Sequence, residues 1–325
     1  MSCDPTLNNK PDASAIGALG YVLAKNGATP YDWSSGTIER WPILFEDMRE
    51  VRRLVGHRNV ITGSRQRRSK LARQGASMFV GRISMPISAR LLQDIIPKLI
   101  GVDDTADDTF NPGTLQEFGV LINRHYGTFE YQGCKVAQWA IRGRSIQFNE
   151  RNAEPDLMTL TMQIYAKDRT FNEATAPSPL PAWGTTDDYC NYFFDQTTTA
   201  TLQGVASRRL EEWVLTGNNY LDVLYGLSRK PTSICSLDTQ INFQARARWN
   251  KTQSSMFNTD LAASNSAVLA LSQGNVSTTF NFGDLKIVNG DPSIQGKGRV
   301  RWNLEAEVLS TNSSNDIQIV NDATV

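Results

Sequence analysis

The sequence predicts a mainly β protein: two similar antiparallel β-sandwich or barrel domains, each with a flanking α-helix, behind an extended N-terminal arm. The first observation is the length of 325 residues, which suits two domains better than one core. The second is the alternation of apolar and polar residues in long segments, which is typical of strands with one buried face. The third is an internal echo, in which KVAQWAIRG at 135–143 returns as RLEEWVLTG at 209–217.

The N-terminal third contains the predicted arm and the first predicted helix. Residues 1–36 are rich in Gly, Ala, Asn, Pro and Ser and lack periodicity, so we expect an extended arm. SARLLQDIIPKLIG at 88–101 has one apolar stripe at helical spacing, and Ser88 can cap the first turn. Pro97 should bend the last turn of this helix, because proline lacks the N–H that the turn needs.

Strand patterns dominate the chain from residue 117 onward. The alternating segments before the middle are EFGVLINRHY (117–126), FEYQG (129–133), KVAQWAIRGRSIQF (135–148) and DLMTLTMQIYAKD (156–168). Three prolines in 172–190 indicate a linker, so we place one domain at 37–176 and the other at 177–325.

The second half repeats this pattern. Period two returns in NYFFDQTTTATLQG (191–204), RRLEEWVLTGNNYLDVLYG (208–226), LDTQINFQARARW (237–249), STTFNFGDLKIV (277–288) and GRVRWNLEAEVL (298–309). TDLAASNSAVLALSQ at 259–273 is predicted to form the second helix, with Asp260 near its N-terminus.

The echo has two interpretations. Only a few residue types suit a pleated, half-buried surface, so unrelated strands can look alike. Matched Trp and Gly within one strand, with similar strands on both sides, favour a duplicated domain instead. One predicted helix precedes its strands and the other follows them, so the two halves are either permuted or share elements.

Composition narrows the classes of function. Formal net charge is zero, so no field of the whole protein selects nucleic acid or an anionic membrane. The four cysteines are scattered without a CxxC, which favours reduced thiols in a protein made in the cytoplasm. The start MSCDPTLNN has no signal-peptide pattern, and no apolar run is long enough to span a membrane.

The sequence offers no catalytic constellation. Its two histidines, His57 and His125, lie at no metal-ligand spacing from Cys or each other, and no GxSxG nucleophile elbow is present. We therefore expect no enzyme activity, no cofactor and no metal site.

The segment 46–73 is the strongest charge feature. Its basic residues are Arg49, Arg52, Arg53, Arg58, Arg65, Arg67, Arg68, Lys70 and Arg73. Such a segment can bind phosphate, although no aromatic residues are interleaved with it for stacking on bases. A protein–protein contact is the other interpretation, because arginine pairs well with carboxylates and the acidic run DDTADD follows the first helix. A contact between subunits would then join Arg65, Arg67 and Arg68 to Asp103, Asp104, Asp107 and Asp108.

The order and spacing of several weak motifs resemble a known family. They are VITGSRQRRSKLARQGASMFVGRISMPISARLLQDIIPKLIG, GCKVAQWAIRG, LTMQIYAKD, the Pro-rich joint, FFDQTTTATLQG and DPSIQGKGRVRWNLEAEVL. Over residues 45–310 the chain is similar to the tail tube (major tail) proteins of long-tailed bacteriophages, in the subgroup with two fused tube domains.

This resemblance implies a structural role. Three chains would form a ring whose six tube domains imitate a hexamer, and rings would stack into a hollow tail tube. DNA would pass through the tube without specific binding, other tail proteins would be partners, and no membrane would be involved. The protein would be made and assembled in the cytoplasm of the host bacterium and reside in the virion tail.

A DNA conduit should repel phosphates rather than hold them, which favours an acidic lumen. The candidates are Glu117, Glu130, Glu211 and Glu212, although ordinary solvent-facing strand positions would look the same. Two other functions remain open: another virion structural protein (tail terminator, distal-tail or decoration protein), or a nucleic-acid-binding module that uses residues 46–73.

Overall fold

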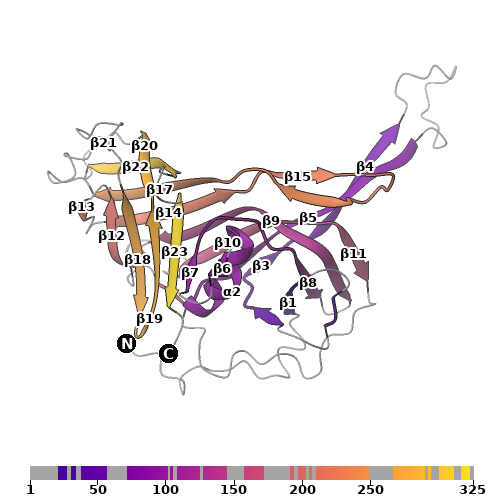
Figure 1. Cartoon of the computed structure of the whole chain (residues 1–325), viewed down its shortest axis with the longest axis horizontal. Helices are drawn as coiled ribbons and strands as arrows, with labels where there is room; N and C mark the ends of the chain where they lie inside the picture. Colours follow the sequence, from indigo (N-terminus) through magenta and orange to yellow (C-terminus); the bar gives the residue numbers. More distant parts are fainter. Residues whose placement is uncertain are drawn as a thin grey trace.

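The computed structural model of the chain is mainly β, which confirms the predicted fold class (Figure 1). It describes residues 21–27, 31–33, 38–56, 72–101, 103–104, 108–124, 127–144, 157–171, 191–193, 197–202, 205–206, 210–248, 266–289, 292–293, 300–310 and 316–322. Among these residues, the strands form antiparallel sheets of 14, 7 and 2 strands. Within these ranges one helix is present, α2 (Ala89–Leu99).

The first group of strands, called the first unit below, lies in the 14-stranded sheet. Its members are β1 (Tyr21–Asn26), β2 (Glu39–Trp41), β3 (Phe45–Glu46), β4 (Arg49–Gly56), β5 (Ala72–Pro86), β8 (Phe118–Asn123), β9 (Thr128–Arg144), β10 (Thr159–Ala166) and β11 (Asp168–Phe171). The long strand β9 takes part in two strand orders. Its first half lies in the order β2-β1-β8-β9-β11, and its second half lies in the order β4-β5-β10-β9.

The second group, called the second unit, repeats both orders. Its members are β12 (Thr197–Leu202), β13 (Val205–Ala206), β14 (Leu210–Asn218), β17 (Gln240–Arg248), β18 (Ala267–Gln273), β19 (Val276–Phe282), β20 (Asp284–Asn289), β21 (Pro292–Ser293), β22 (Arg301–Leu309) and β23 (Ile317–Asp322). The orders are β13-β12-β18-β19-β23 and β14-β17-β22-β20. Each strand therefore has a counterpart at the same place in the other unit and in the same chain order, which is a tandem arrangement without permutation.

A detail of register repeats as well. Where β10 pairs with β9, Ala137 is skipped, because Gln163 lies opposite Gln138 and Ile164 lies opposite Val136. Where β22 pairs with β20, Val288 is skipped in the same way between Ile287 and Asn289. A β-bulge is a specific structural feature, so its recurrence at the same place strengthens the correspondence between the units.

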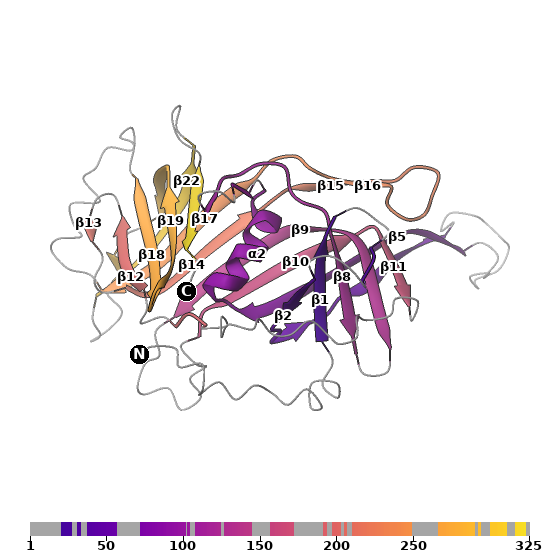
Figure 2. The same cartoon turned by 60° about the horizontal axis from the view of Figure 1, so that its bottom comes forward.

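The two units also share elements. β6 (Asp103–Asp104) and β7 (Thr109–Phe110) follow α2 in the chain, yet they extend the seven-stranded sheet of the second unit beyond β23. Figure 2 shows α2 in front of β9 and β10, between β1 and β8 on one side and the yellow strands of the second unit on the other. The side chain of Asn321 on β23 donates to the carbonyl of Ala89 at 2.9 Å. The helix therefore packs against both units.

The two Trp strands of the echo are neighbours rather than counterparts. β14 pairs directly with β9, with Trp213 opposite Gly143 and Gly217 opposite Trp139. Both indoles are buried. A Cβ built on Gly217 would lie 2.2 Å from Cε2 of Trp139, and one built on Gly143 would lie 2.8 Å from Nε1 of Trp213. Each glycine thus leaves room for the indole of the adjacent strand, and the repeated Trp–Gly spacing reflects reciprocal packing where the units join.

The predicted helix at 88–101 is confirmed as α2. Ser88 precedes it in an extended conformation, and its Oγ accepts from the N–H of Leu91 at 3.2 Å. The predicted apolar stripe is buried against the sheets. Pro97 lies in the last turn, two residues before the helix ends at Leu99. Because proline has no N–H, it donates no hydrogen bond to the carbonyl four residues earlier.

Loss of the cap should weaken the protein measurably. We expect Ser88→Ala to lower the free energy of unfolding by about 1 kcal/mol, because the N–H of Leu91 loses its buried acceptor. Urea denaturation checks this value. Ser88→Thr keeps the hydroxyl and should retain most of the stability; equal losses in both variants would show that the cap is not the cause.

Three sequence predictions differ from the structure or fall outside the described residues. The second helix predicted at 259–273 is wrong over Ala267–Gln273, which forms strand β18 with Ala267, Leu269 and Leu271 buried in alternation; residues 259–265 lie outside the described residues. Part of the predicted arm 1–36 is a core strand, because Tyr21–Asn26 forms β1 between β2 and β8. The predicted linker 172–190 lies outside the described residues, and the domain limits 37–176 and 177–325 stay a prediction.

A buried ion pair ties the helix to the N-terminal strands. Nζ of Lys98 lies 2.9 Å from both carboxylate oxygens of Glu39 on β2, and the lysine side chain is fully buried. Nε1 of Trp41 and the amide of Asn26 also donate to this carboxylate, each at 3.3 Å. Burial raises the pKa of Glu39 above its ordinary value, and the charge of Lys98 opposes that rise.

Candidate functional site

The open face of the 14-stranded sheet is polar. On β9, β17 and β22, inward residues are buried while outward residues alternate with them. The exposed outward residues of these strands are Gln138, Arg142, Arg144, Gln244, Asn303, Glu305 and, at the end of β22, Leu309. The same face continues across the junction of the two units, because β9 and β14 are paired. One continuous polar surface therefore spans both units.

Charges on this face are partly neutralised within it. Arg142 on β9 binds Glu212 on β14, with Nη2 and Oε1 2.6 Å apart. Gln244 donates to Glu305 at 3.3 Å, and Gln240 donates to Glu307 at 3.0 Å. Such exposed pairs contribute little to stability, so their main effect is on the electrostatic character of the surface.

The four predicted lumen glutamates do not gather in one place. Glu212 lies on the open face, and Glu211 lies beside it at a register shift of β14. Glu130 is buried and accepts from Nε1 of Trp33 at 3.1 Å. Glu117 binds Lys167, with Oε2 and Nζ 2.5 Å apart.

Glu117 and Glu130 lie near the buried thiol of Cys134. Burial raises the pKa of this thiol above its ordinary value, and both carboxylates add to the rise. A thiol in this environment stays protonated and unreactive, so the cysteine packs as a small apolar residue.

The predicted contact between basic and acidic residues is only partly described. Arg65, Arg67, Arg68 and Asp107 lie outside the described residues. Asp103 and Asp104 form the short edge strand β6, and Oδ1 of Asp108 accepts from the side chain of Gln93 at 2.9 Å. The structure therefore places one of the acidic side chains, and it lies beside α2.

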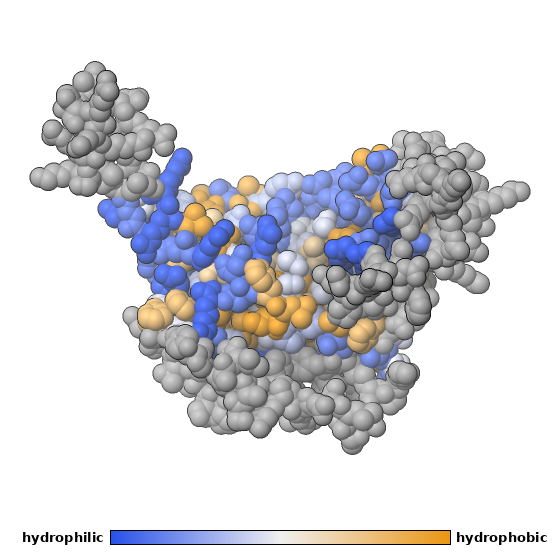
Figure 3. All heavy atoms as spheres, turned by 180° about the vertical axis from the view of Figure 1, so that it is seen from behind, coloured by the Kyte–Doolittle hydropathy of each residue, from blue (hydrophilic) through white to orange (hydrophobic). Residues whose placement is uncertain are grey.

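The strand order β4-β5-β10-β9-β14-β17-β22-β20 ends at two edges that have no further strand partner among the described residues. At one edge β3 and β4 pair only with β5, and at the other β20 and β21 pair only with β22. Exposed apolar side chains lie at both edges: Ile43, Leu44, Phe45, Val51 and Val288. Unpaired strand edges with apolar side chains readily accept another strand. On the face in Figure 3, apolar residues likewise form a band within a mostly hydrophilic surface.

The sequence did not reveal these edges. The unbroken apolar run Pro42–Phe45 was the available signal, because it follows neither the strand period nor the helix period.

Arg124 holds the edge strand β3 in place. Its guanidinium donates to both carboxylate oxygens of Glu46, at 2.6 and 2.8 Å, and to the carbonyl of Met48 at 2.6 Å. The hydroxyl of Tyr131 donates to the same carbonyl at 3.0 Å. Hydrogen bonding to Glu46 raises the pKa of Arg124 above its ordinary value, so the clamp is permanently charged.

Removal of this clamp should loosen the edge. We expect Arg124→Ala to lower the free energy of unfolding by about 2 kcal/mol, because a partly buried carboxylate and a carbonyl lose charge-assisted hydrogen bonds. Hydrogen exchange should rise most at Glu46–Met48. Arg124→Lys keeps the charge but not the two-pronged contact and should fall between; an unchanged exchange rate in Arg124→Ala would contradict the clamp.

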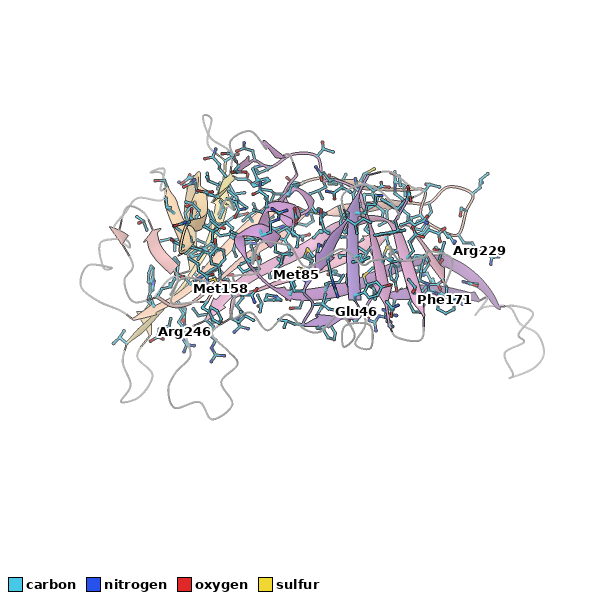
Figure 4. The ribbon with its side chains drawn as sticks, turned by 90° about the horizontal axis from the view of Figure 1, so that it is seen from below. Glu46, Met85, Met158, Phe171, Arg229 and Arg246 are labelled. Carbon is cyan, nitrogen blue, oxygen red and sulfur yellow. The ribbon has the colours of Figure 1, made fainter. Side chains whose placement is uncertain are left out.

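A hairpin of the second unit lies over the first unit. It consists of β15 (Leu221–Leu224) and β16 (Ser233–Ser236), between β14 and β17. Near its tip, the carbonyl of Arg229 accepts from the N–H of Ser77 on β5 at 2.9 Å, and Lys230 forms an ion pair with Asp168. Figure 4 shows Arg229 at the same end of the molecule as Phe171, far from Arg246. The hairpin therefore reinforces the junction between the units.

Metal sites and membrane-spanning helices are missing from the described residues. Within this part of the chain, no cluster of three or more His, Cys, Asp or Glu side chains is placed to hold a metal ion. None of the described helical residues forms a helix long and apolar enough to cross a membrane.

Two similar β units, a continuous polar face and two open edges define a mainly β protein built of tandem units. The family described as phage tail tube protein matches residues 52–308, which is most of the chain. The chain therefore belongs to the phage tail tube protein family and is a structural protein of the virion tail. No curated protein matches the sequence.

Proposed function

We propose that the protein self-assembles into rings of three chains that stack into the hollow tail tube through which phage DNA passes. The observation that carries this proposal is the tandem strand order, because each chain supplies two wedges of the same architecture. Three chains then give six similar wedges, and a head-to-tail contact closes into a ring when the rotation per wedge is suitable. Assembly takes place in the host cytoplasm, and other tail proteins bind the ends of the tube.

The open sheet face is proposed to line the lumen. It is polar and partly self-neutralised through Arg142 and Glu212, so it offers little that would hold a phosphate backbone. Glu212 is the lumen candidate that this face supports best, with Glu211 next to it. Glu117 and Glu130 are proposed to act there only if their present partners, Lys167 and Trp33, release them.

Contacts between stacked rings are proposed to use the basic segment. Reversing the charge at Arg65, Arg67 and Arg68 should block stacking, and reversing Asp103, Asp104, Asp107 and Asp108 as well should restore it. Normal tubes after the first change alone would refute this pairing.

Negative-stain electron microscopy of the purified full-length chain tests the proposed function. Hollow tubes built of stacked three-fold rings are the expected result. A monomer that retards DNA in gels, with affinity falling steeply as salt rises, would instead favour a nucleic-acid-binding module. Isolated rings that never stack would favour a tail terminator or distal-tail protein.

A further inference from the structure

The joint between the two units within the chain is fully defined. β9 and β14 run antiparallel with Asn218 opposite Gln138 and Leu215 opposite Ile141. Next to this ladder, the N–H of Asn219 donates to the carbonyl of Ala137 at 2.8 Å. β9, the last strand of the order β4-β5-β10-β9 in the first unit, is thus joined to β14, the first strand of the order β14-β17-β22-β20 in the second unit.

The bulges identify the counterpart of β9 residue by residue. Because Ala137 and Val288 are the skipped residues, Gln138 corresponds to Asn289. The correspondence continues past the bulge, since Ile141 lies opposite Leu160 just as Pro292 of β21 lies opposite Trp302. β20 and β21 together therefore form the counterpart of the second half of β9.

The ladder across the sheet identifies the counterpart of β14. From the bulges, Tyr165 of β10 corresponds to Glu307 of β22, and their partners are Val80 and Asn242. Two residues before Val80 and Asn242 in their strands, Met78 lies opposite Val51 and Gln240 lies opposite Asn218. Val51 of β4 is therefore the counterpart of Asn218 of β14.

In the same two strand orders, β20 is the last strand of the second unit and β4 is the first strand of the first unit. These two strands are the open edges. Figure 1 places β20 and β4 at opposite ends of the molecule, so one chain cannot join them to each other. A second copy of the chain can supply the missing strand to each edge, in the way that strand addition extends a sheet.

We propose that β20 and β21 of one copy pair antiparallel with β3 and β4 of the next copy, in the register that joins β9 to β14. Asn289 then lies opposite Val51 of the next copy, and the carbonyl of Val288 accepts from the N–H of Arg52 of the next copy. This inference rests on the proposed function and specifies the contact that closes the ring.

Burial supports this assignment. Ala137, which lies within the occupied joint, is 5 % exposed, whereas its counterpart Val288 at the open edge is 68 % exposed. Val51 is 46 % exposed at the other edge. Apolar side chains at both edges would thus become covered by the same contact, which is the distribution expected of a surface that is completed by a partner.

The two joints differ in strength. The counterparts of Trp213 and Gly217 on the edge strands are Glu46 and Glu50, which lie opposite Ile83 and Phe79. The joint between copies therefore lacks both Trp–Gly contacts, because one of them needs Trp213 and the other needs Gly217. It depends more on backbone pairing and on the apolar edge residues, so it should form and separate reversibly while the joint within the chain persists.

Disulfide trapping tests the register in the full-length chain. Cys3, Cys190 and Cys235 are first replaced by serine, and the buried Cys134 is kept. Val51→Cys together with Asn289→Cys should convert the monomer band on a non-reducing gel into dimers and trimers under mild oxidation. These positions correspond to the opposed pair Asn218 and Gln138, whose geometry brings Cα atoms within disulfide range.

Matched variants make the result decisive. Asn218→Cys with Gln138→Cys should form an intrachain disulfide and leave a monomer, and either single edge variant should give no trimer. Arg49→Cys with Asn289→Cys lies two residues out of register and should not link. Tubes that form without any Val51–Asn289 link, or that link equally well out of register, would overturn this joint while sparing the proposed function. A protein that never forms rings or tubes would overturn both.

Discussion

Replacing Gly217 with alanine should lower the free energy of unfolding by about 3 kcal/mol, because a Cβ at this position would overlap the buried indole of Trp139. The closest approach would be 2.2 Å, to a rigid ring that has no flexible end to move aside. The clash lies in the ladder that joins the two units, so we also expect β9 and β14 to separate locally. Guanidinium denaturation and hydrogen exchange at the two strands measure the two effects.

Two variants separate this clash from a general effect of alanine. Gly226→Ala lies in the hairpin loop, where a Cβ would meet only a methyl group of Thr232 at 3.2 Å, and it should change stability little. Trp139→Phe combined with Gly217→Ala should recover part of the loss, because the smaller ring leaves room for the methyl group. Additive losses in that double variant would contradict the packing account.

Replacing Lys98 with methionine should lower the free energy of unfolding by about 4 kcal/mol, because it leaves the carboxylate of Glu39 buried without its counter-ion. Lys98→Met with Glu39→Gln should regain much of this loss, since no uncompensated charge remains and the amide oxygen introduced on β2 can still accept from Nε1 of Trp41. Thermal unfolding of the two variants and the parent protein gives the comparison.

The loss in Lys98→Met should depend on pH. Burial already raises the pKa of Glu39, and removal of Lys98 takes away the charge that opposes the rise. A carboxyl group whose pKa is higher in the folded than in the unfolded state favours folding below the unfolded pKa, and this contribution is lost as pH rises through the folded pKa. The variant should therefore be closest to the parent at about pH 5 and furthest from it at about pH 8. A loss that is constant with pH would show that packing dominates.

Strand and helix periods predicted much of the fold. The apolar stripe of residues 88–101 and the capping residue Ser88 predicted α2. The alternation of apolar and polar residues in 156–168 and 298–309 predicted β10 and β22. The same rule failed at Ala267–Gln273, where every residue from Ala267 to Leu271 is apolar and only burial of alternate residues reveals the strand.

The echo led to a correct architecture through a wrong correspondence. Trp and Gly recur at the same spacing because Trp139 covers Gly217 and Trp213 lies against Gly143 across one ladder, which is a cross-strand requirement. True counterparts such as Val51 and Asn218, or Tyr165 and Glu307, share position and pairing but little side-chain chemistry. A repeat that survives in strand order and in a bulge is therefore invisible to comparison of residues.

The candidate surfaces were harder to predict than the fold. A single sequence does not show which strand ends a sheet, because edge strands and central strands alternate alike. Glu130 has the pattern of a solvent-facing strand residue, yet Trp33, ninety-seven positions earlier, covers it and binds its carboxylate. Contacts between distant segments decide both cases.

The central claim is that two tandem units in each of three chains build one ring, and the symmetry and mass of an isolated ring test it most directly. End-on electron-microscopy averages should show six similar lobes with three-fold symmetry, and native mass spectrometry should give the mass of three 36.1 kDa chains. A ring with the mass of six chains, or one without three-fold symmetry, would contradict the account.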